Sequence, residues 1–186
     1  MKRKRRVLVD VDGVVADLVG VLAHSLGTVP EAFTVPRFSE DPAFSPIEVA
    51  YMERLMVAPG FVRRLPLYDA AERGLYEMRT HGWEVVFCTH QYEASPTWVF
   101  DRHGWLDEHF PKHPVIYARE KHMVDGDVLV EDTPANAEAF VAVYPGRRHA
   151  YLVERPWNES WRREKRRQRI TPVGDLLEVA RFLLTS

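Results

Sequence analysis

VLVDVDGVVAD, residues 7–17, is the stretch of this chain that decides its fold. An apolar run ends here in two carboxylates, two positions apart, that are followed by glycine. Because side chains alternate along a strand, we expect Asp10 and Asp12 to face the same way near the carboxyl end of a strand. Open α/β sheets bind their ligands at that end. Two acids held close together repel each other unless a cation or a proton intervenes, so the stretch predicts a hydrolytic metal site.

The same kind of short apolar run recurs along the chain and alternates with helical patterns. The expected strands are 7–11, 84–88, 114–118, 127–131 and 150–154. This alternation predicts an α/β fold with a parallel sheet and right-handed crossovers. The expected helices begin at Ser95-Pro96 and Thr133-Pro134, where a hydroxyl side chain precedes a first-turn proline, and run from Tyr68 to Gly82 and from Asp175 to Leu184.

Residues 18–65 interrupt this alternation between the first and second predicted strands. A βα connection is normally about 2–6 residues long, whereas this segment has several prolines and helical patterns of its own at 18–28 and 46–57. We therefore expect a core domain of residues 1–17 and 66–186 and a small helical cap of residues 18–65. The aromatic candidates in the cap for stacking a nucleobase are Phe33, Phe38, Phe44, Tyr51 and Phe61.

Composition narrows the class of protein. The chain has 186 residues, of which 46% are hydrophobic, which is enough for a well-packed core. No apolar run is long enough to span a membrane, no secretory signal is expected, and the single Cys88 predicts a cytoplasmic protein without an internal disulfide. Two basic clusters, 2–6 and 162–169, are interpreted as solvated surfaces rather than as a nucleic-acid interface.

Polar residues follow three further predicted strands. Thr89 comes after the second, Lys121 after the third, and Glu131 and Asp132 after the fourth. If the strands are parallel, these groups meet Asp10 at one sheet edge. A carboxylate can attack phosphorus, oxygen ligands suit Mg²⁺, and a hydroxyl and an ammonium can stabilise charge on a transferring phosphoryl group. The pattern indicates phosphoryl transfer.

In these residues the chain resembles the haloacid-dehalogenase-like hydrolases. Their DxDG motif is matched by residues 10–13, their Thr by Thr89, their Lys by Lys121, and their late acidic motif by GDVLVED at 126–132. The resemblance implies a three-layer α/β/α Rossmann-like fold with a central parallel sheet and a small helical cap inserted after the first strand.

Within that superfamily the chain is most similar to the 5′(3′)-deoxyribonucleotidases. The likeness lies in residues 9–17, 87–89, 101–110 and 155–158 and is thinner in the expected cap. Three positions depart from the family pattern: Glu131 replaces an Asp, Leu18 replaces an aromatic residue, and His90 replaces a Ser. The last two bear on the choice of substrate.

The resemblance implies a role for each candidate residue. Asp10 is the expected nucleophile, and Asp12 is the expected acid and base. The expected Mg²⁺ ligands are Asp10, the backbone carbonyl of Asp12, and Asp132. The expected substrate-binding residues are Thr89, His90 and Lys121, and the expected supports of the metal shell are Asp127 and Glu131.

We therefore expect a Mg²⁺-dependent phosphomonoesterase that dephosphorylates (deoxy)nucleoside monophosphates through an aspartyl phosphate. One alternative keeps this chemistry and changes the substrate to a sugar phosphate or another small phosphorylated metabolite. Another is a nucleic-acid-binding module on a catalytically idle scaffold, for which the basic clusters would be responsible. The expected partner is a small phosphorylated substrate rather than a membrane, and a homodimer is left open.

Overall fold

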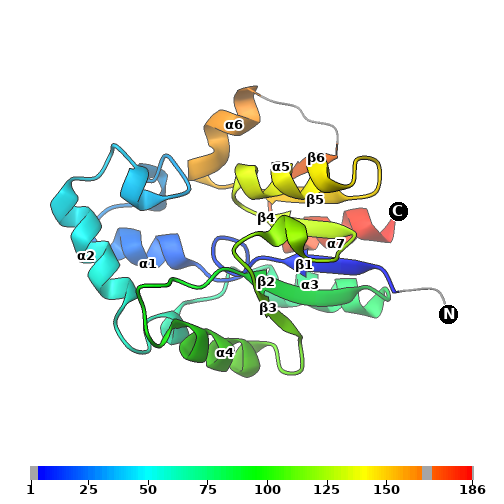
Figure 1. Cartoon of the computed structure of the whole chain (residues 1–186), viewed down its shortest axis with the longest axis horizontal. Helices are drawn as coiled ribbons and strands as arrows, with labels where there is room; N and C mark the ends of the chain where they lie inside the picture. Colours follow the sequence, from blue (N-terminus) through cyan, green and yellow to red (C-terminus); the bar gives the residue numbers. More distant parts are fainter. Residues whose placement is uncertain (1–3, 165–168, 186) are drawn as a thin grey trace.

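A parallel sheet of six strands forms the centre of the computed structural model, which describes residues 4–164 and 169–185 (Figure 1). The strand order is β3-β2-β1-β4-β5-β6, and every neighbouring pair is parallel. The strands are β1 Arg6–Val9, β2 Glu84–Thr89, β3 Val115–Tyr117, β4 Val128–Glu131, β5 His149–Val153 and β6 Ile170–Val173.

Helices cover both faces of this sheet. The α-helices are α1 Leu18–Ser25, α2 Pro46–Met56, α3 Ala71–Thr80, α4 Trp98–His109, α5 Pro134–Val143, α6 Glu159–Glu164 and α7 Leu176–Leu184. Successive residues of the strands point to opposite cores. Val7 and Val9 pack with side chains of α3, α4 and α7, whereas Leu8 packs with Ala137 and Phe140 of α5. The expected three-layer α/β/α fold with a parallel sheet is confirmed.

Some local expectations were wrong. Strand β6 was not expected, because its Pro172 lacks an N–H; the proline is tolerated because β6 is an edge strand. Helix α4 begins two residues after Pro96, with Thr97 rather than Ser95 before its first residue. Strand β1 ends at Val9, so Asp10 and Asp12 lie in the following loop and are not held to the alternation of a strand.

Residues 18–65 contain α1, α2 and the 3-10 turns η1 Pro30–Ala32, η2 Phe38–Glu40 and η3 Val62–Arg64. Helices α1 and α2 lie beyond the carboxyl end of β1, on the left of Figure 1. The capping box of Ser45 and Glu48 fixes the start of α2. Among the expected stacking aromatics, Phe33 and Phe61 are buried, and the Phe33 ring packs on Phe44 at 4.6 Å. No helix in the described part of the chain is long and apolar enough to cross a bilayer.

Candidate active site

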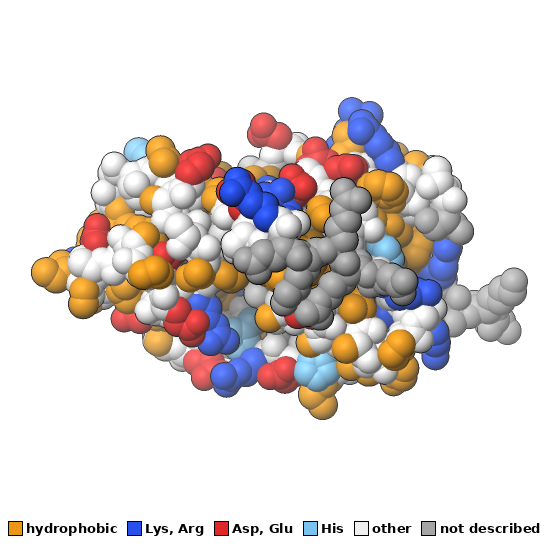
Figure 2. Space-filling view, turned by 90° about the horizontal axis from the view of Figure 1, so that it is seen from above, with side chains coloured by type: hydrophobic (Ala, Val, Ile, Leu, Met, Phe, Trp, Pro, Cys, Tyr) orange, Lys and Arg blue, Asp and Glu red, His pale blue; other side chains and the backbone are white. Residues whose placement is uncertain are grey.

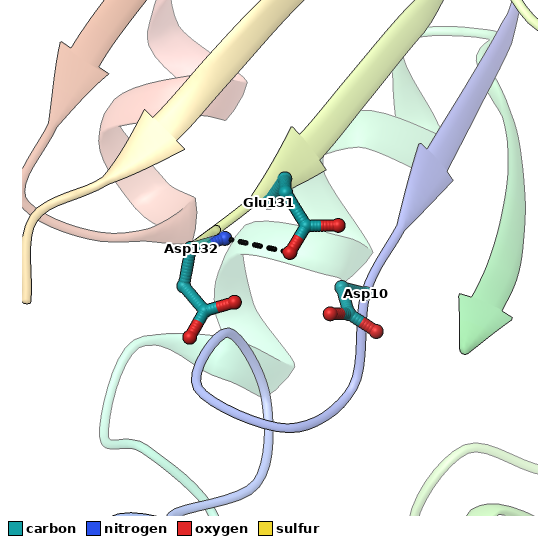
Figure 3. Close-up of side chains that lie close together, drawn as sticks. All are labelled: Asp10, Glu131 and Asp132. Atoms are coloured by element: carbon teal, nitrogen blue, oxygen red, sulfur yellow. Dashed lines mark hydrogen bonds between the residues drawn. The ribbon is translucent and has the colours of Figure 1, made fainter. Parts of the chain in front are cut away.

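The acidic residues meet where the strand order reverses. Strands β1 and β4 are neighbours, and the chain leaves β1 toward β2 on one side and β4 toward β5 on the other. Asp10 follows β1, Glu131 ends β4, and Asp132 comes next (Figure 3). One carboxylate oxygen from each of the three lies within 4.8 Å of the others, and all three residues are buried. Such a switch point is the usual ligand site of an open parallel sheet.

Lys121 pairs with two acids of this cluster, Asp10 and Glu131. It is the first residue of the 3-10 turn η4 Lys121–Met123, and its side chain is 3% exposed. Its Nζ donates to Asp10 Oδ2 at 2.6 Å and to Glu131 Oε2 at 2.7 Å. Burial opposes the charge of Lys121, but these two carboxylates outweigh it and raise the pKa of the ammonium. Lys121 therefore stays charged, with one of its three N–H donors left for a substrate.

Residues after β5 hold Asp132 in place. Trp157 Nε1 donates to Asp132 Oδ2 at 2.9 Å, and Asn158 Nδ2 donates to the Asp132 carbonyl at 2.8 Å. Both come from the 3-10 turn η5 Pro156–Asn158 and are buried. Asp132 is thus fixed on two sides before any ligand arrives. The likeness of residues 155–158 to the nucleotidases marked this segment, but it did not indicate that Trp157 binds the candidate metal ligand.

Glu131 is held differently from the other two acids. Its Oε1 accepts from the backbone N–H groups of Asp132 at 3.2 Å and Thr133 at 3.1 Å, and its Oε2 accepts from Lys121. Both oxygens are therefore occupied by protein donors. This geometry favours Glu131 as the residue that orients Lys121 and the Asp132 backbone.

Gly13 closes the other side of the cluster. Its φ of +75° lies in the left-handed region, and a Cβ there would lie 2.1 Å from Asp132 Oδ2. Only glycine satisfies both the backbone conformation and this approach. The Gly13 carbonyl accepts from Arg155 Nε at 2.7 Å, and the Arg155 guanidinium lies 4.0 Å over the Tyr68 ring. The loop after β1 is thereby held against the segments that follow β5 and residue 65.

Asp12 faces a different partner from Asp10. Its carboxylate accepts a short hydrogen bond from Arg102 Nη2, and Arg102 lies on α4 with no exposed side-chain surface. Asp12 is accordingly absent from the cluster of three carboxylates. Sequence reasoning missed Arg102. The available signal was its place on the apolar face of a helix, four residues after Trp98 and three before Trp105, where an unpaired arginine is unexpected.

The remaining predicted residues are not all at this edge. Thr89 ends β2 and is 1% exposed, and His90 follows it with a half-exposed side chain. Burial is the main cause of a lowered His90 pKa, and the nearby Arg119 and Lys121 lower it further. Asp127 does not lie where its expected role in the metal shell requires. It precedes β4, and its Oδ2 accepts from the Arg6 backbone N–H at 2.8 Å. It lies at the amino end of the sheet, roughly 16 Å of strand away from Asp132, so it does not support the metal shell.

The charges of the cluster suit a divalent cation. Three carboxylates face one ammonium, which leaves an excess of two negative charges in a buried site. Burial and the neighbouring Glu131 raise the pKa of Asp10 to about 7, and burial followed by Asp10 raises the pKa of Asp132. The donors are all oxygens, as Mg²⁺ prefers. Asp10 and Asp132 are the residues that would hold such an ion.

Known proteins resemble this chain in sequence and in fold. It is 26% identical over 161 residues to a Bordetella pertussis protein provisionally named a 5′(3′)-deoxyribonucleotidase, covering 82% of this chain and 84% of that one. It is 29% identical over 145 residues to the human cytosolic-type 5′(3′)-deoxyribonucleotidase, covering 71% and 72%. The D,D-heptose 1,7-bisphosphate phosphatase of B. bronchiseptica, solved with magnesium and phosphate, matches with a TM-score of 0.57 at 13% identity over 97% and 98% of the two chains.

A family model supplies the assignment. The model described as 5′ nucleotidase, deoxy (pyrimidine), cytosolic type C protein matches residues 4–183, which include every residue of the cluster. The solved structures with the same fold include haloacid dehalogenases. The expected fold, family and enzyme class are confirmed: the chain has the fold of the haloacid-dehalogenase-like hydrolases, is a phosphomonoesterase and belongs to this 5′-nucleotidase family.

Proposed function

We propose that this chain is a Mg²⁺-dependent 5′(3′)-deoxyribonucleotidase that works through an aspartyl phosphate. The observation that carries the proposal is the meeting of Asp10, Lys121 and Asp132 at the carboxyl edge of β1 and β4. A nucleophilic carboxylate, a fixed cation and a metal-binding carboxylate there are the components that phosphoryl transfer needs.

The first step forms a bond between Asp10 and phosphorus. As that bond forms, the bond from phosphorus to the leaving oxygen breaks, and Asp12 gives its proton to this oxygen. The remaining N–H of Lys121 and the hydroxyl of Thr89, which ends the neighbouring strand β2, bind the phosphoryl oxygens. Asp10, Asp132 and the Asp12 carbonyl would hold Mg²⁺, which would supply positive charge that favours approach of the phosphate to Asp10.

The second step restores the enzyme. Asp12, now ionised, takes a proton from a water molecule that attacks phosphorus. The bond from phosphorus to Asp10 breaks, which releases inorganic phosphate and regenerates the Asp10 carboxylate. Trp157, Asn158 and Gly13 make no chemical contribution of their own: they fix Asp132 relative to Asp10.

We also propose that residues 18–65 act as a cap over this site, on a core of residues 1–17 and 66–186. Both ends of the segment are fastened together, because Asp17 N–H donates to the Pro66 carbonyl at 2.9 Å and Ala16 pairs with Leu67. A cap closed over the edge would exclude water and shape a pocket beside His90. We propose further that the enzyme works in the cytoplasm on a small phosphorylated nucleotide, which the likeness to the human cytosolic-type relative supports.

The basic clusters do not favour the nucleic-acid alternative where they can be described. Arg162 pairs with Glu154 at 3.1 Å, and Arg163 pairs with Glu159 at 2.6 Å. Figure 2 shows basic side chains lying among acidic ones on the face that carries α6. The rest of these clusters, residues 2–3 and 165–168, lies outside the described residues.

Initial rates on a panel of phosphate esters test the proposal. Wild-type protein should release phosphate from deoxynucleoside monophosphates with Mg²⁺ and should stop when EDTA is added. Asp10→Asn should lose this activity because an amide does not attack phosphorus, while remaining folded by circular dichroism. Full activity of Asp10→Asn would refute the mechanism, and equal rates on nucleotides and sugar phosphates would replace the nucleotide by a broader substrate class.

A further inference from the structure

A buried arginine contacts the proposed acid and base, and no other part of the proposed mechanism uses it. Arg102 has no exposed side-chain surface, and its guanidinium lies 5.5 Å from the rings of both Trp98 and Trp105. Nη2 donates to Asp12, whereas Nε and Nη1 are buried without a hydrogen-bond partner among the described residues. Burying a guanidinium is costly unless it is paired. The ion pair with Asp12 is therefore what offsets the cost of burying Arg102.

Helix α4 holds Arg102 firmly because two residues near Arg102 on this helix hydrogen-bond to the end of the 18–65 segment. Asp101 Oδ2 accepts from the Gly60 N–H at 2.7 Å, and Trp105 Nε1 donates to the Leu65 carbonyl at 2.8 Å. The residue before Arg102 and the residue three after it are thus tied to residues 60–65. Arg102 is presented to Asp12 from a rigid support rather than from a mobile surface side chain.

Asp12 needs such a support because β1 ends before it. Its side chain is 21% exposed and lies in a loop, so the strand does not fix its direction. Nearby Asp10 carries the same charge, and Lys121 is already paired with Asp10 and Glu131. The bond to Arg102 selects one direction for the Asp12 carboxylate and keeps it from competing for Lys121.

We propose that Arg102 is a positioning residue that holds the Asp12 carboxylate where it reaches the leaving oxygen of the substrate. This inference rests on the proposed phosphatase function. General acid catalysis requires the donor within roughly 2.6–3.2 Å of the oxygen that it protonates, and it contributes about 10²–10⁴-fold. A misdirected Asp12 loses this contribution for an alkoxide leaving group, which must be protonated as its bond to phosphorus breaks. In this first step it matters much less for a phenolate leaving group that departs without a proton, whereas the second step is the same for both kinds of substrate.

The test compares two substrates in one preparation. We expect Arg102→Met to lower kcat/KM, which reports the steps up to loss of the leaving group, at least tenfold more for a deoxynucleoside monophosphate than for p-nitrophenyl phosphate. Because both rates come from the same sample, their ratio does not depend on the fraction of protein that is folded. Arg102→Lys keeps the charge but loses the planar fork of donors, so it should give an intermediate ratio. It also provides the measurement if the Met variant does not fold.

Arg63→Met is the matched control. Arg63 packs on Gly104 of the same helix and lies 3.5 Å from Glu108, without contacting Asp12, so its loss should leave the ratio of the two rates unchanged. Equal losses of kcat/KM on both substrates, or no loss, in a folded Arg102 variant would overturn the positioning role while wild-type activity stands. A wild-type protein that hydrolyses neither ester would overturn the proposed function, and this inference with it.

Discussion

Replacing Trp157 by Phe tests whether the structure has identified the metal ligand and its support. The substitution keeps a ring in a site that is 4% exposed and deletes one hydrogen bond, from Nε1 to Asp132 Oδ2 at 2.9 Å. That bond holds the carboxylate in one direction and lowers its pKa against the effect of burial, which raises it. Without the bond, Asp132 turns more freely and takes up a proton more readily, and both changes oppose metal binding.

The size of the effect follows from the kind of hydrogen bond. A bond to a charged group contributes about 1.5–3 kcal/mol, and 1.4 kcal/mol corresponds to about tenfold in an equilibrium constant. We therefore expect the Mg²⁺ concentration for half-maximal activity to rise about 10- to 100-fold. The same range is typical when a residue that orients a metal ligand is removed. The activity at saturating Mg²⁺ should fall much less.

The assay is a Mg²⁺ titration of phosphate release, with thermal unfolding to show that the variant is folded. Trp161→Phe is the control, because Trp161 Nε1 donates to Glu138 Oε1 at 2.6 Å, away from the acidic cluster. It should leave the Mg²⁺ requirement unchanged. A folded Trp157→Phe protein with the wild-type Mg²⁺ dependence would refute the assignment of Asp132 as a ligand held by Trp157.

Three further changes have defined outcomes. Gly13→Ala should abolish phosphate release, because the new Cβ would lie 2.1 Å from Asp132 Oδ2; wild-type rates would contradict this. Asp101→Asn should lower the free energy of unfolding by about 1–3 kcal/mol in urea, because it weakens the 2.7 Å bond from Gly60 N–H. Burial raises the pKa of Asp41, but hydrogen bonds from Ala43 and Thr34 outweigh it and hold the pKa below its ordinary value. The stability gained from Asp41 is therefore complete above the ordinary carboxyl pKa and lost as pH falls through the depressed value, so melting temperatures of wild type and Asp41→Asn should converge in acid.

The sequence predicted those parts of the molecule that depend on periodicity and chain order. Apolar runs ending in polar residues predicted the strands, and parallel pairing brought Asp10, Lys121, Glu131 and Asp132 to one edge. Prediction from the sequence failed where the position of a residue in the folded molecule overrides the local pattern. Strand β6 contains a proline that only its edge position makes acceptable. Asp127 has the same residue type as two acids of the buried cluster but lies at the opposite end of its strand.

The pairing of charges is the part that no local pattern could have predicted. Two carboxylates two positions apart invite the inference that they act on one ion together, yet Asp10 pairs with Lys121 and Asp12 pairs with Arg102. These cations come from different elements, η4 and α4, so the division follows from how the elements pack. In the proposed mechanism this division separates two tasks that one carboxylate cannot perform at once. Asp10 stays in the acidic cluster, whose excess negative charge a divalent cation would balance. Asp12 is held away from that cluster by Arg102 and remains partly exposed, so that it can exchange a proton with the substrate.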